Sequence, residues 1–292
     1  MRVLLATDGS KCAENAARLL ARLPHAEKLE LTIISVNYLP GFHRTVESVE
    51  WARLGGVEFT RNKAAEACRR VEAMFEGANA QIETVISDGH PGITIVEQAK
   101  SRNIDLVVLG ALGHTFFERV FLGSVSDFVA THATCSVLVV RPGKMEGADE
   151  KLDICVAYDD SDSCKRALVG LGDLQWQRNV KLDLVSVIAG PYIYAEVPIE
   201  IDSEATRQSA MAELEQAAAE LRHHSRTVQC HVIESTHIGS GIIAAAEEFG
   251  NNMIVMGDTG RGLMGRFFLG SVSRYVLQHA KCSVAIVRRG DR

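Results

Sequence analysis

The chain has no excess of basic residues, no long apolar run and no paired cysteines. Lysine and arginine number 31 against 37 aspartate and glutamate, a net charge of -6. Nucleic acids and anionic membranes select basic surfaces, so the charge argues against either as the main partner. An anionic small ligand stays open, because a few backbone N–H groups and a helix dipole bind phosphate locally.

Signals for export and membrane insertion are also missing. The apolar run at residues 3–6 is too short for a signal peptide, and no stretch approaches the roughly 18 apolar residues that span a bilayer. The seven cysteines include no Cys-x2-Cys pair and no metal-ligand spacing. Cys135 and Cys282 stand at equivalent positions before apolar strands, which favours burial over redox function. We expect a cytoplasmic protein.

What the sequence does contain is a duplicated glycine pattern. Gly-x2-Gly-x9-Gly-Ser begins at Gly110 and again at Gly257, an offset of 147. Each copy follows an apolar run and precedes a helical pattern, as in loops that bind phosphate at a helix N-terminus. The repeat also relates residues 2–10 to 153–161, at an offset of 151. The sequence therefore predicts two domains, residues 1–143 and 151–292, joined by a polar linker.

Within each half, short apolar runs alternate with helical patterns. In the first half, strands are expected at 2–7, 30–36, 80–87, 104–109 and 136–141, and helices at 11–23, 60–77, 91–102 and 122–133. In the second half, strands are expected at 152–158, 181–187, 227–234, 252–257 and 283–288, and helices at 162–174, 203–223, 239–249 and 269–280. Continuously apolar strands indicate parallel strands covered on both faces. The prediction is an α/β fold of two tandem, doubly wound, five-stranded parallel sheets with the flavodoxin-like order 3-2-1-4-5.

Open α/β sheets bind ligands beyond the carboxyl ends of their strands, where the winding direction reverses. Asp8 or Asp159 ends the first strand of each half, and a glycine loop follows the fourth. An Asp in this place caps a helix or accepts hydrogen bonds from a ribose or adenine, and both readings stay open. The segment from 37 to 60 contains two glycine-containing turns and is interpreted as a flap or a short helix.

The spacers between the glycines carry candidate cations. Arg119 and Arg266 coincide in the repeat, and His114 faces Arg261. These side chains either pair with a phosphate or stay solvated, and the sequence does not decide between the two. His132 and His279 each end a helix, which favours capping over catalysis. No residue stands out as a general base for attack on phosphate, so the pattern indicates binding without an evident catalytic group.

These motifs closely resemble the universal stress protein family in its tandem form, and the glycine motifs resemble its ATP-binding branch. The resemblance implies that the base and ribose of ATP, or of ADP or AMP, lie against Ala6, Thr7, Asp8 and Val36. It places the phosphates, with Mg2+ held through them, at Gly110, Gly113, Gly123, Ser124, Val125 and Ser126. The matching positions in the second half are Ala157, Asp159, Val187, Gly257, Gly260, Gly270, Ser271, Val272 and Ser273.

Some positions depart from the family pattern. Gly239-Ser240-Gly241 replaces Gly-x-Pro, and serine replaces the proline after Cys135 and Cys282. Tyr158 and Asp160 replace Thr7 and Gly9, which changes bulk and charge at the second pocket. The two pockets therefore depart from the pattern in different places.

Members of this family usually pair through their last strands, so the resemblance implies an intrachain pseudo-dimer, open to further homodimerisation. We expect a stress-response module that binds adenine nucleotide and switches contacts with an unidentified protein partner. The alternatives are a slow ATPase or phosphotransferase, and a structural tandem protein with vestigial pockets.

Overall fold

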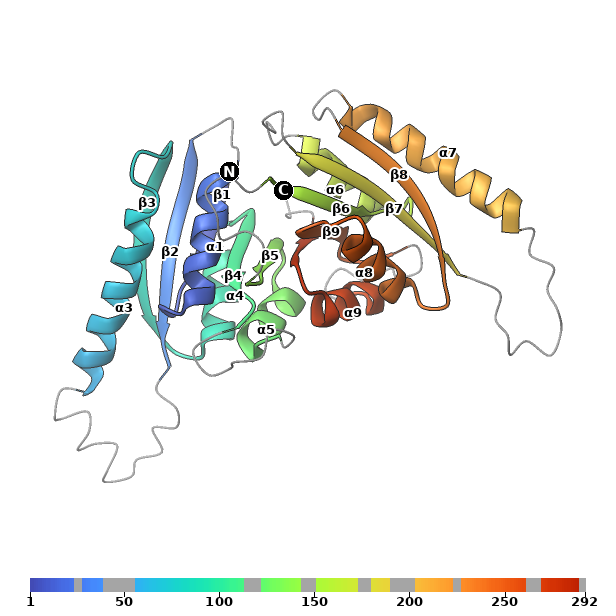
Figure 1. The fold of residues 1–292 in the computed structure, drawn as a ribbon. Coiled ribbons are helices and arrows are strands. Elements are labelled where there is room, and N and C mark those ends of the chain that lie inside the picture. The colour runs from blue at the N-terminus through green and yellow to red at the C-terminus, as the bar shows by residue number, and fades with distance from the viewer. Residues whose placement is uncertain are drawn as a thin grey trace. The chain divides into compact units, whose positions relative to one another are not determined.

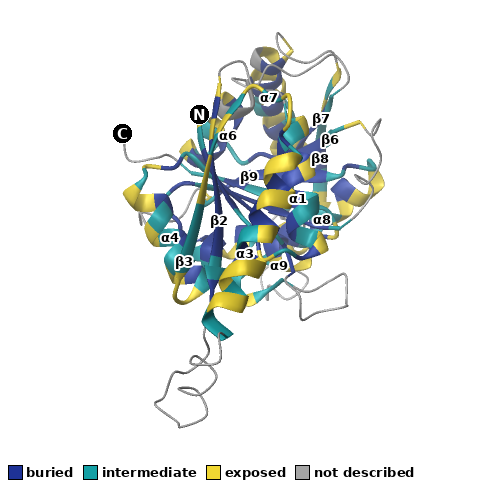
Figure 2. Ribbon diagram, turned by 90° about the vertical axis from the view of Figure 1, so that its left-hand side faces the viewer, coloured by how far each residue is buried: buried dark blue, intermediate teal, exposed yellow. Residues whose placement is uncertain are grey.

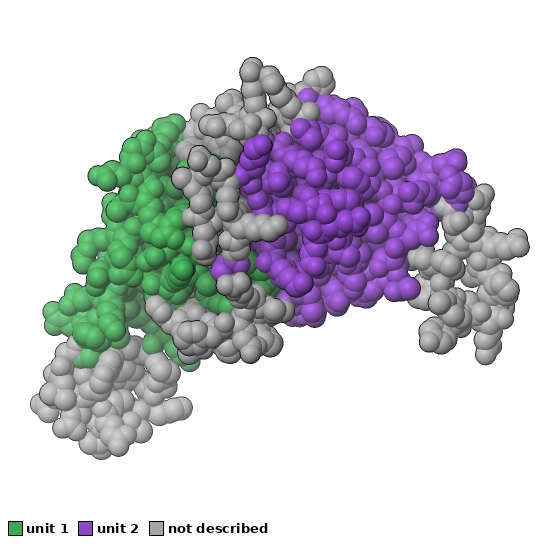
Figure 3. Space-filling model, viewed as in Figure 1, with its two compact units in different colours: residues 1–141 green, residues 142–292 purple. Residues whose placement is uncertain are grey.

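The structure is a computed structural model of the 292-residue chain. It describes residues 1–23, 28–38, 56–112, 122–142, 151–172, 180–189, 203–222, 227–260 and 269–288. The chain divides into two compact units, residues 1–141 and residues 142–292 (Figure 3). Each unit is described by itself.

In unit 1, strands and helices alternate from the first residues onward (Figure 1). Its strands are β1 (Arg2–Ala6), β2 (Leu29–Asn37), β3 (Ala80–Asp88), β4 (Leu106–Gly110) and β5 (Ser136–Val140). Its helices are α1 (Lys11–Arg22), α3 (Gly56–Ala73), α4 (Pro91–Ser101) and α5 (Ser124–His132). All of these elements were predicted, with ends that differ by a few residues.

Unit 2 repeats the same succession of elements. Its strands are β6 (Asp153–Ala157), β7 (Lys181–Ala189), β8 (Thr227–Ser235), β9 (Met253–Gly257) and β10 (Ser283–Val287). Its helices are α6 (Asp162–Gly172), α7 (Ser203–Leu221), α8 (Ile238–Glu248) and α9 (Ser271–His279).

The strands of each unit form a parallel sheet with the predicted order. Unit 1 has β3-β2-β1-β4-β5, and unit 2 has the matching order β8-β7-β6-β9-β10. The chain moves outward from β1 to β3, then returns to the other side of β1 at β4. The winding direction therefore reverses between β1 and β4, and between β6 and β9, where open α/β sheets bind ligands.

Helices cover the sheets and leave the central strands buried. In unit 1, α3 lies along β2 and β3, and in unit 2, α7 lies along β7 and β8 (Figure 1). The central strands are dark blue in Figure 2 because their side chains are buried on both faces. Val3, Leu4 and Leu5 of β1 are completely buried in succession. This burial explains why the strands read as continuous apolar runs.

The largest shift from the predicted boundaries is in α3, expected over 60–77 and found over Gly56–Ala73. After Ala73 the backbone changes to hydrogen bonds between residues three apart, from Met74 N–H to Val71 and from Phe75 N–H to Glu72. Gly77 then adopts a φ of +81°, which leaves the helical region. The expected flap lies largely in residues 39–55, outside the described residues.

Two smaller expectations concern cysteine and histidine. Cys135 is buried, as predicted, whereas Cys282 is only partly buried. His132 Nδ1 donates to the Phe128 carbonyl at 2.8 Å, and His279 Nδ1 donates to the Tyr275 carbonyl at 2.8 Å. Both histidines therefore bond the last turn of their helices, as the capping interpretation requires.

Candidate functional site

The site in each unit begins at the carboxyl ends of two neighbouring strands. In unit 1, β1 pairs with β4, so Asp8, which follows β1, and Gly110, which ends β4, open onto the same edge of the sheet. In unit 2, the pairing of β6 with β9 does the same for Asp159 and Gly257. The sequence placed a crevice here only on the condition that these strands are neighbours. The structure meets that condition.

The glycine loops are closed by one backbone hydrogen bond in each unit. Gly123 N–H donates to the Ala111 carbonyl at 2.7 Å, and Gly270 N–H donates to the Asp258 carbonyl at 2.7 Å. Each bond brings the residue before the helix back to the residue that follows β4 or β9. The N-termini of α5 and α9 are thus fixed beside the carboxyl end of the strand.

Buried serine hydroxyls reinforce this closure. Ser126 Oγ lies 2.9 Å from the carbonyl oxygens of both Ala111 and Gly123. In unit 2, Ser273 Oγ donates to the Gly257 carbonyl at 2.9 Å. The hydroxyl protons of these serines are engaged inside the loop. Their backbone N–H groups, rather than their hydroxyls, are what they can present to an anion.

Both helices begin without a side-chain cap. The N-cap residues, Gly123 and Gly270, have extended backbones with ψ of 152° and 156°, and neither has a side chain to bond the first turn. The first N–H groups of a helix have no partner within the helix and carry its partial positive charge. Ser124 and Ser271, the first helical residues, are exposed. The two helix starts therefore suit a bound anion.

Two glycines are required by close approach. A Cβ on Gly110 would lie 2.8 Å from the backbone carbonyl carbon of Cys12 at the start of α1. A Cβ on Gly260 would lie 2.8 Å from Asp159 Oδ2, so a larger residue would push into the carboxylate. At both positions a glycine lets the loop lie close to the segment that follows the first strand of the unit.

In unit 1, the loop and the strand ends surround a cavity of about 310 Å3. The structure brings together at this cavity nine of the positions singled out in the sequence: Ala6, Thr7, Asp8, Val36, Gly110, Gly123, Ser124, Val125 and Ser126. Gly113, His114 and Arg119 lie outside the described residues. Sequence reasoning missed Tyr38, Pro91 and Ile95, which also line the cavity.

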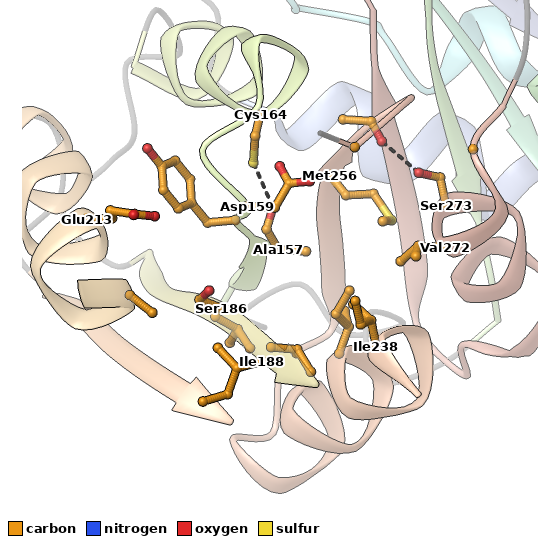
Figure 4. Close-up of a pocket in the computed structure, with 18 of the residues that line it drawn as sticks. Ala157, Asp159, Cys164, Ser186, Ile188, Glu213, Ile238, Met256, Val272 and Ser273 are labelled. Atoms are coloured by element: carbon orange, nitrogen blue, oxygen red, sulfur yellow. Dashed lines mark hydrogen bonds between the residues drawn. The ribbon is translucent and has the colours of Figure 1, made fainter. Parts of the chain in front are cut away.

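In unit 2, the equivalent cavity measures about 690 Å3 (Figure 4). All nine positions singled out in this half line it: Ala157, Asp159, Val187, Gly257, Gly260, Gly270, Ser271, Val272 and Ser273. Arg261 and Arg266 lie outside the described residues. The sequence did not predict the contribution of α7, from which Thr206, Ser209, Ala210 and Glu213 face the cavity. No sequence motif includes Glu213, so the sequence alone does not mark it as a cavity residue.

The two aspartates make similar local bonds. Asp8 Oδ1 accepts from Ser10 N–H at 2.9 Å, and Asp159 Oδ1 accepts from Ser161 N–H at 3.1 Å. Ser161 Oγ adds a bond of 2.6 Å to the same oxygen of Asp159. Each carboxylate thereby shapes the turn before α1 or α6 while lining the cavity. Shaping the turn before the helix and contacting a ligand are therefore compatible roles for these aspartates.

The turn after β6 differs from the turn after β1. Gly9 has a φ of +77°, and Asp160 occupies the matching place with a φ of +58°. The Tyr158 hydroxyl donates to Asp160 Oδ1 at 2.9 Å, and Lys165 Nζ pairs with the same oxygen at 3.0 Å. These contacts hold a non-glycine residue in the left-handed region, where Asp is tolerated better than most residues.

Polar side chains surround the second glycine loop. Asp258 follows Gly257, at the place of Ala111, and accepts from Ser163 Oγ at 2.6 Å. Arg288 Nε lies 3.6 Å from Asp258 Oδ2. The carboxylate is therefore held below the loop by its own partners.

Cys164 lies on the wall of the second cavity and donates from Sγ to the Ala157 carbonyl at 2.9 Å (Figure 4). Burial raises the pKa of this thiol to about 12. It stays protonated at neutral pH and is unsuited to act as a nucleophile. Within the described ranges, no group of three or more His, Cys, Asp and Glu side chains could hold a metal ion. No helix among the described residues is long and apolar enough to cross a membrane.

The fold and the two cavities define a class of protein. Each unit is a doubly wound α/β domain whose glycine-rich loop and uncapped helix start face an aspartate across the switch point of the sheet. The chain belongs to the universal stress protein family, because the model of that family, described as "Universal stress protein family", matches residues 1–141 and 152–288. The two matches make it a tandem member.

Individual relatives agree with this assignment. A universal stress protein of Methanocaldococcus jannaschii is 32% identical over 145 residues, which cover 50% of this chain and 84% of the relative. A universal stress protein of Bacillus subtilis is 27% identical over 154 residues, covering 48% of this chain and 98% of the relative. The crystal structure of a universal stress protein from Archaeoglobus fulgidus superposes with a TM-score of 0.70 at 22% identity, covering 99% of this chain and 98% of that one. That likeness extends over both units and concerns the fold.

Proposed function

We propose that each unit binds one nucleotide, with ATP as the ligand of unit 1, and that the chain is a nucleotide-responsive binding module. The observation that carries the proposal is the uncapped start of α5 and α9 inside a cavity that also contains an aspartate. Phosphate binds at the helix N-terminus, where N–H groups and the helix dipole converge. Asp8 or Asp159 accepts from the ribose hydroxyls, and the base lies against Ala6 or Ala157.

The apolar walls suit a base in unit 1. Ile34, Val36, Tyr38, Pro91 and Ile95 line the part of the cavity beyond Asp8. A planar base buries its faces against such side chains, and a few polar groups orient it. Mg2+ would be held mainly through the phosphates, because the described residues supply no carboxylate cluster for it. ADP and AMP fit the same geometry with fewer contacts at the helix.

The proposed biological role follows the family. A stress-response protein that binds nucleotide without an evident catalytic base acts through binding, by changing its contacts with a protein partner. The cytoplasmic location stays a prediction of the sequence. The described cavity residues include no histidine, and both aspartates are already engaged in turn hydrogen bonds. Slow hydrolysis is therefore the secondary expectation.

The test uses a charge placed at the helix start. Ser124→Glu in unit 1 and Ser271→Glu in unit 2 each add a carboxylate where a phosphate would bind. A carboxylate in the first turn favours the helix, so the fold is preserved while the phosphate is repelled. Calorimetric titration of the full chain with Mg-ATP should show binding in unit 1 that Ser124→Glu weakens by tenfold or more. Ser124→Gln is the matched uncharged control.

Two results would contradict the proposed site. If the unmodified chain binds no adenine nucleotide, or if Ser124→Glu and Ser124→Gln leave affinity equally unchanged, the proposed site is wrong. Circular dichroism of both variants checks that the helices remain.

A further inference from the structure

The two cavities differ most at the end away from the glycine loop. The cavity of unit 2 is larger, about 690 Å3 against about 310 Å3. Its additional wall comes from α7, which contributes Thr206, Ser209 and Glu213. No residue of α3, the helix that follows the second strand of unit 1, lines the smaller cavity.

Glu213 faces the end of the cavity opposite to the helix start. In Figure 4 it lies on one side of Asp159, and Val272 and Ser273 lie on the other. Glu213 is also close enough to Tyr158 to act on it. Burial chiefly raises the pKa of Tyr158, and Asp160, Cys164 and lastly Glu213 raise it further. The described lining of this cavity contains two carboxylates, Asp159 and Glu213, and no lysine, arginine or histidine.

The two ends of the unit 2 cavity therefore favour different chemical groups of a ligand. The start of α9 favours an anion, whereas Glu213, with the hydroxyls of Thr206 and Ser209 beside it, favours groups that donate hydrogen bonds. A nucleotide with its phosphates at α9 and its ribose at Asp159 extends its base toward Glu213. The edge of a purine farthest from the sugar carries N1 and the substituent on C2. In this placement that edge would be the part of the base nearest to Glu213.

We propose that unit 2 selects guanine nucleotides over adenine nucleotides and that Glu213 is the selecting residue. Guanine presents two adjacent donors on this edge, N1–H and the amino group on C2, which match the two oxygens of a carboxylate. Adenine presents there the lone pair of N1, which a carboxylate repels, and its C6 amino group supplies one donor in place of the adjacent pair of guanine. Unit 1 has Asp8 as the one carboxylate among its described lining residues, and its base-facing wall is apolar apart from Tyr38.

This inference rests on the proposed nucleotide site of unit 2, and the experiment separates the two. In the whole chain carrying Ser124→Glu, binding in unit 1 is weakened and the tighter binding event reports unit 2; Mg-GTP, Mg-ITP and Mg-ATP are titrated in turn. ITP keeps N1–H and lacks the amino group. The expected order of affinity is GTP, then ITP, then ATP, with GTP at least tenfold tighter than ATP, since each bond to a charged group is worth about a factor of ten.

Glu213→Gln removes the charge with little change in shape and should reduce the ratio of GTP to ATP affinity by about tenfold. Glu204→Gln is the matched control, because Glu204 lies on the same helix, is exposed and does not line the cavity. The comparison of GTP with ITP tests the amino group without any change at Glu213.

Four outcomes overturn the inference. ATP that binds unit 2 as tightly as GTP refutes guanine selection and leaves the proposed function standing. A GTP preference that Glu213→Gln does not reduce refutes the assignment to this residue. If unit 2 binds no nucleotide while Ser271→Glu protein binds ATP in unit 1, the inference fails and the proposed function holds for unit 1 alone. If neither unit binds any nucleotide, both fail.

Discussion

At the scale of single residues, the glycines that begin the two glycine patterns make contacts that allow no Cβ. Gly110 packs on the backbone of Cys12, and Gly257 packs on Ser163, whose Cβ would lie 2.8 Å from an added Cβ. The nearest atoms include backbone in both cases, so a rotamer change cannot relieve the clash. In both units the glycine is needed for the close approach of the strand end to the following helix.

Gly110→Ala should therefore destabilise unit 1. The added methyl group forces the loop or the start of α1 to move, and overpacking of this kind costs about 1–3 kcal/mol. Urea unfolding of the full chain should show a lower midpoint. Ser124→Ala, an exposed change next to the same loop, should shift the free energy of unfolding by less than about 0.5 kcal/mol. An unchanged midpoint for Gly110→Ala would contradict the packing.

Buried thiols make a second prediction at this scale. Burial, with a smaller effect of Glu72, raises the pKa of Cys68 to about 11, and burial raises that of Cys164 to about 12. At pH 8 a thiol with a pKa of 11 is about one part in a thousand thiolate. Iodoacetamide at pH 8 should label both cysteines slowly in the native protein and readily in urea. Fast native labelling would show that they are accessible.

The same pKa values set a dependence of stability on pH. The folded state holds these thiols protonated more firmly than the unfolded state, whose pKa is near 9.0. Their contribution to stability is complete below pH 9 and is lost as the pH rises through 11 and 12. The urea midpoint should fall between pH 8 and pH 10.5. Cys68→Ala should make this fall smaller, and an equal fall in both proteins would exclude Cys68 as a cause.

The residues of the glycine loops were readable from the sequence because glycine and the pattern repeat are local signals. Tyr38 and Glu213 were not, since their place on a cavity wall depends on how distant segments pack. Tyr158 and Asp160 were recognised as departures. Their hydrogen bond to one another required the structure, because Asp160 adopts a left-handed backbone that the sequence favours only weakly.

At the scale of elements, a strand of unit 2 contains a buried carboxylate where the matching strand of unit 1 has a hydroxyl. Asp183 of β7 is completely buried, at the position of Thr32. Its carboxylate accepts from Lys181 Nζ at 2.9 Å and from Asn251 Nδ2 at 2.8 Å, and lies 3.1 Å from His231 Nε2. The ring of His231 stacks on Phe249 at the end of α8. This cluster ties β7 to β8 and to the turn before β9.

Asp183→Ala should destabilise unit 2 selectively. Removing one partner of a buried ion pair leaves the others without compensation and costs about 3 kcal/mol or more. Hydrogen–deuterium exchange should show a loss of amide protection in β7 and β8 and no loss of protection in unit 1. Glu247→Gln is a suitable control, because Glu247 pairs with Lys281 at an exposed position and should change stability by less than about 1 kcal/mol.

Elements were predicted well because buried parallel strands read as apolar runs and the helices between them have regular patterns. The predicted bounds of α3 were wrong at both ends of the helix. Ala64 and Val71 lie on the buried face and fix the helix, whereas nothing in the local sequence marks Ala73 as its last residue. Helix ends depend on hydrogen bonds in the following turn, which composition predicts poorly.

At the scale of the whole molecule, the duplication gives two cavities on one chain with different linings. Ligand binding stabilises the state that binds it, by about 2.7 kcal/mol at a ligand concentration of 100 times Kd. Mg-ATP should therefore increase the hydrogen-exchange protection of unit 1, and Mg-GTP that of unit 2. In Ser271→Glu protein, GTP should no longer protect unit 2, while the response of unit 1 to ATP remains. If Ser271→Glu reduced the nucleotide-induced protection of both units equally, the result would contradict separate sites in the two units.

The duplication itself was evident from the sequence, because glycine spacing repeats at a fixed offset. The proposed domain limits at 143 and 151, and the pairing of the two last strands, remain predictions. The asymmetry of the cavities was only partly foreseeable. The replacements at Tyr158 and Asp160 indicated it, but the wall formed by α7 depends on the packing of that helix.

The hydrogen bonds from Gly123 to Ala111 and from Gly270 to Asp258 close each glycine loop at its neck. The start of the helix is thereby set by the neck, whatever course the residues between take. Both spacers contain nine residues, and they share Arg119 with Arg266 and two further positions near the helix while differing at the other six. Because these bonds fix the helix start in both units, we expect that the six differing spacer positions can be substituted without displacing the first turn of α5 or α9.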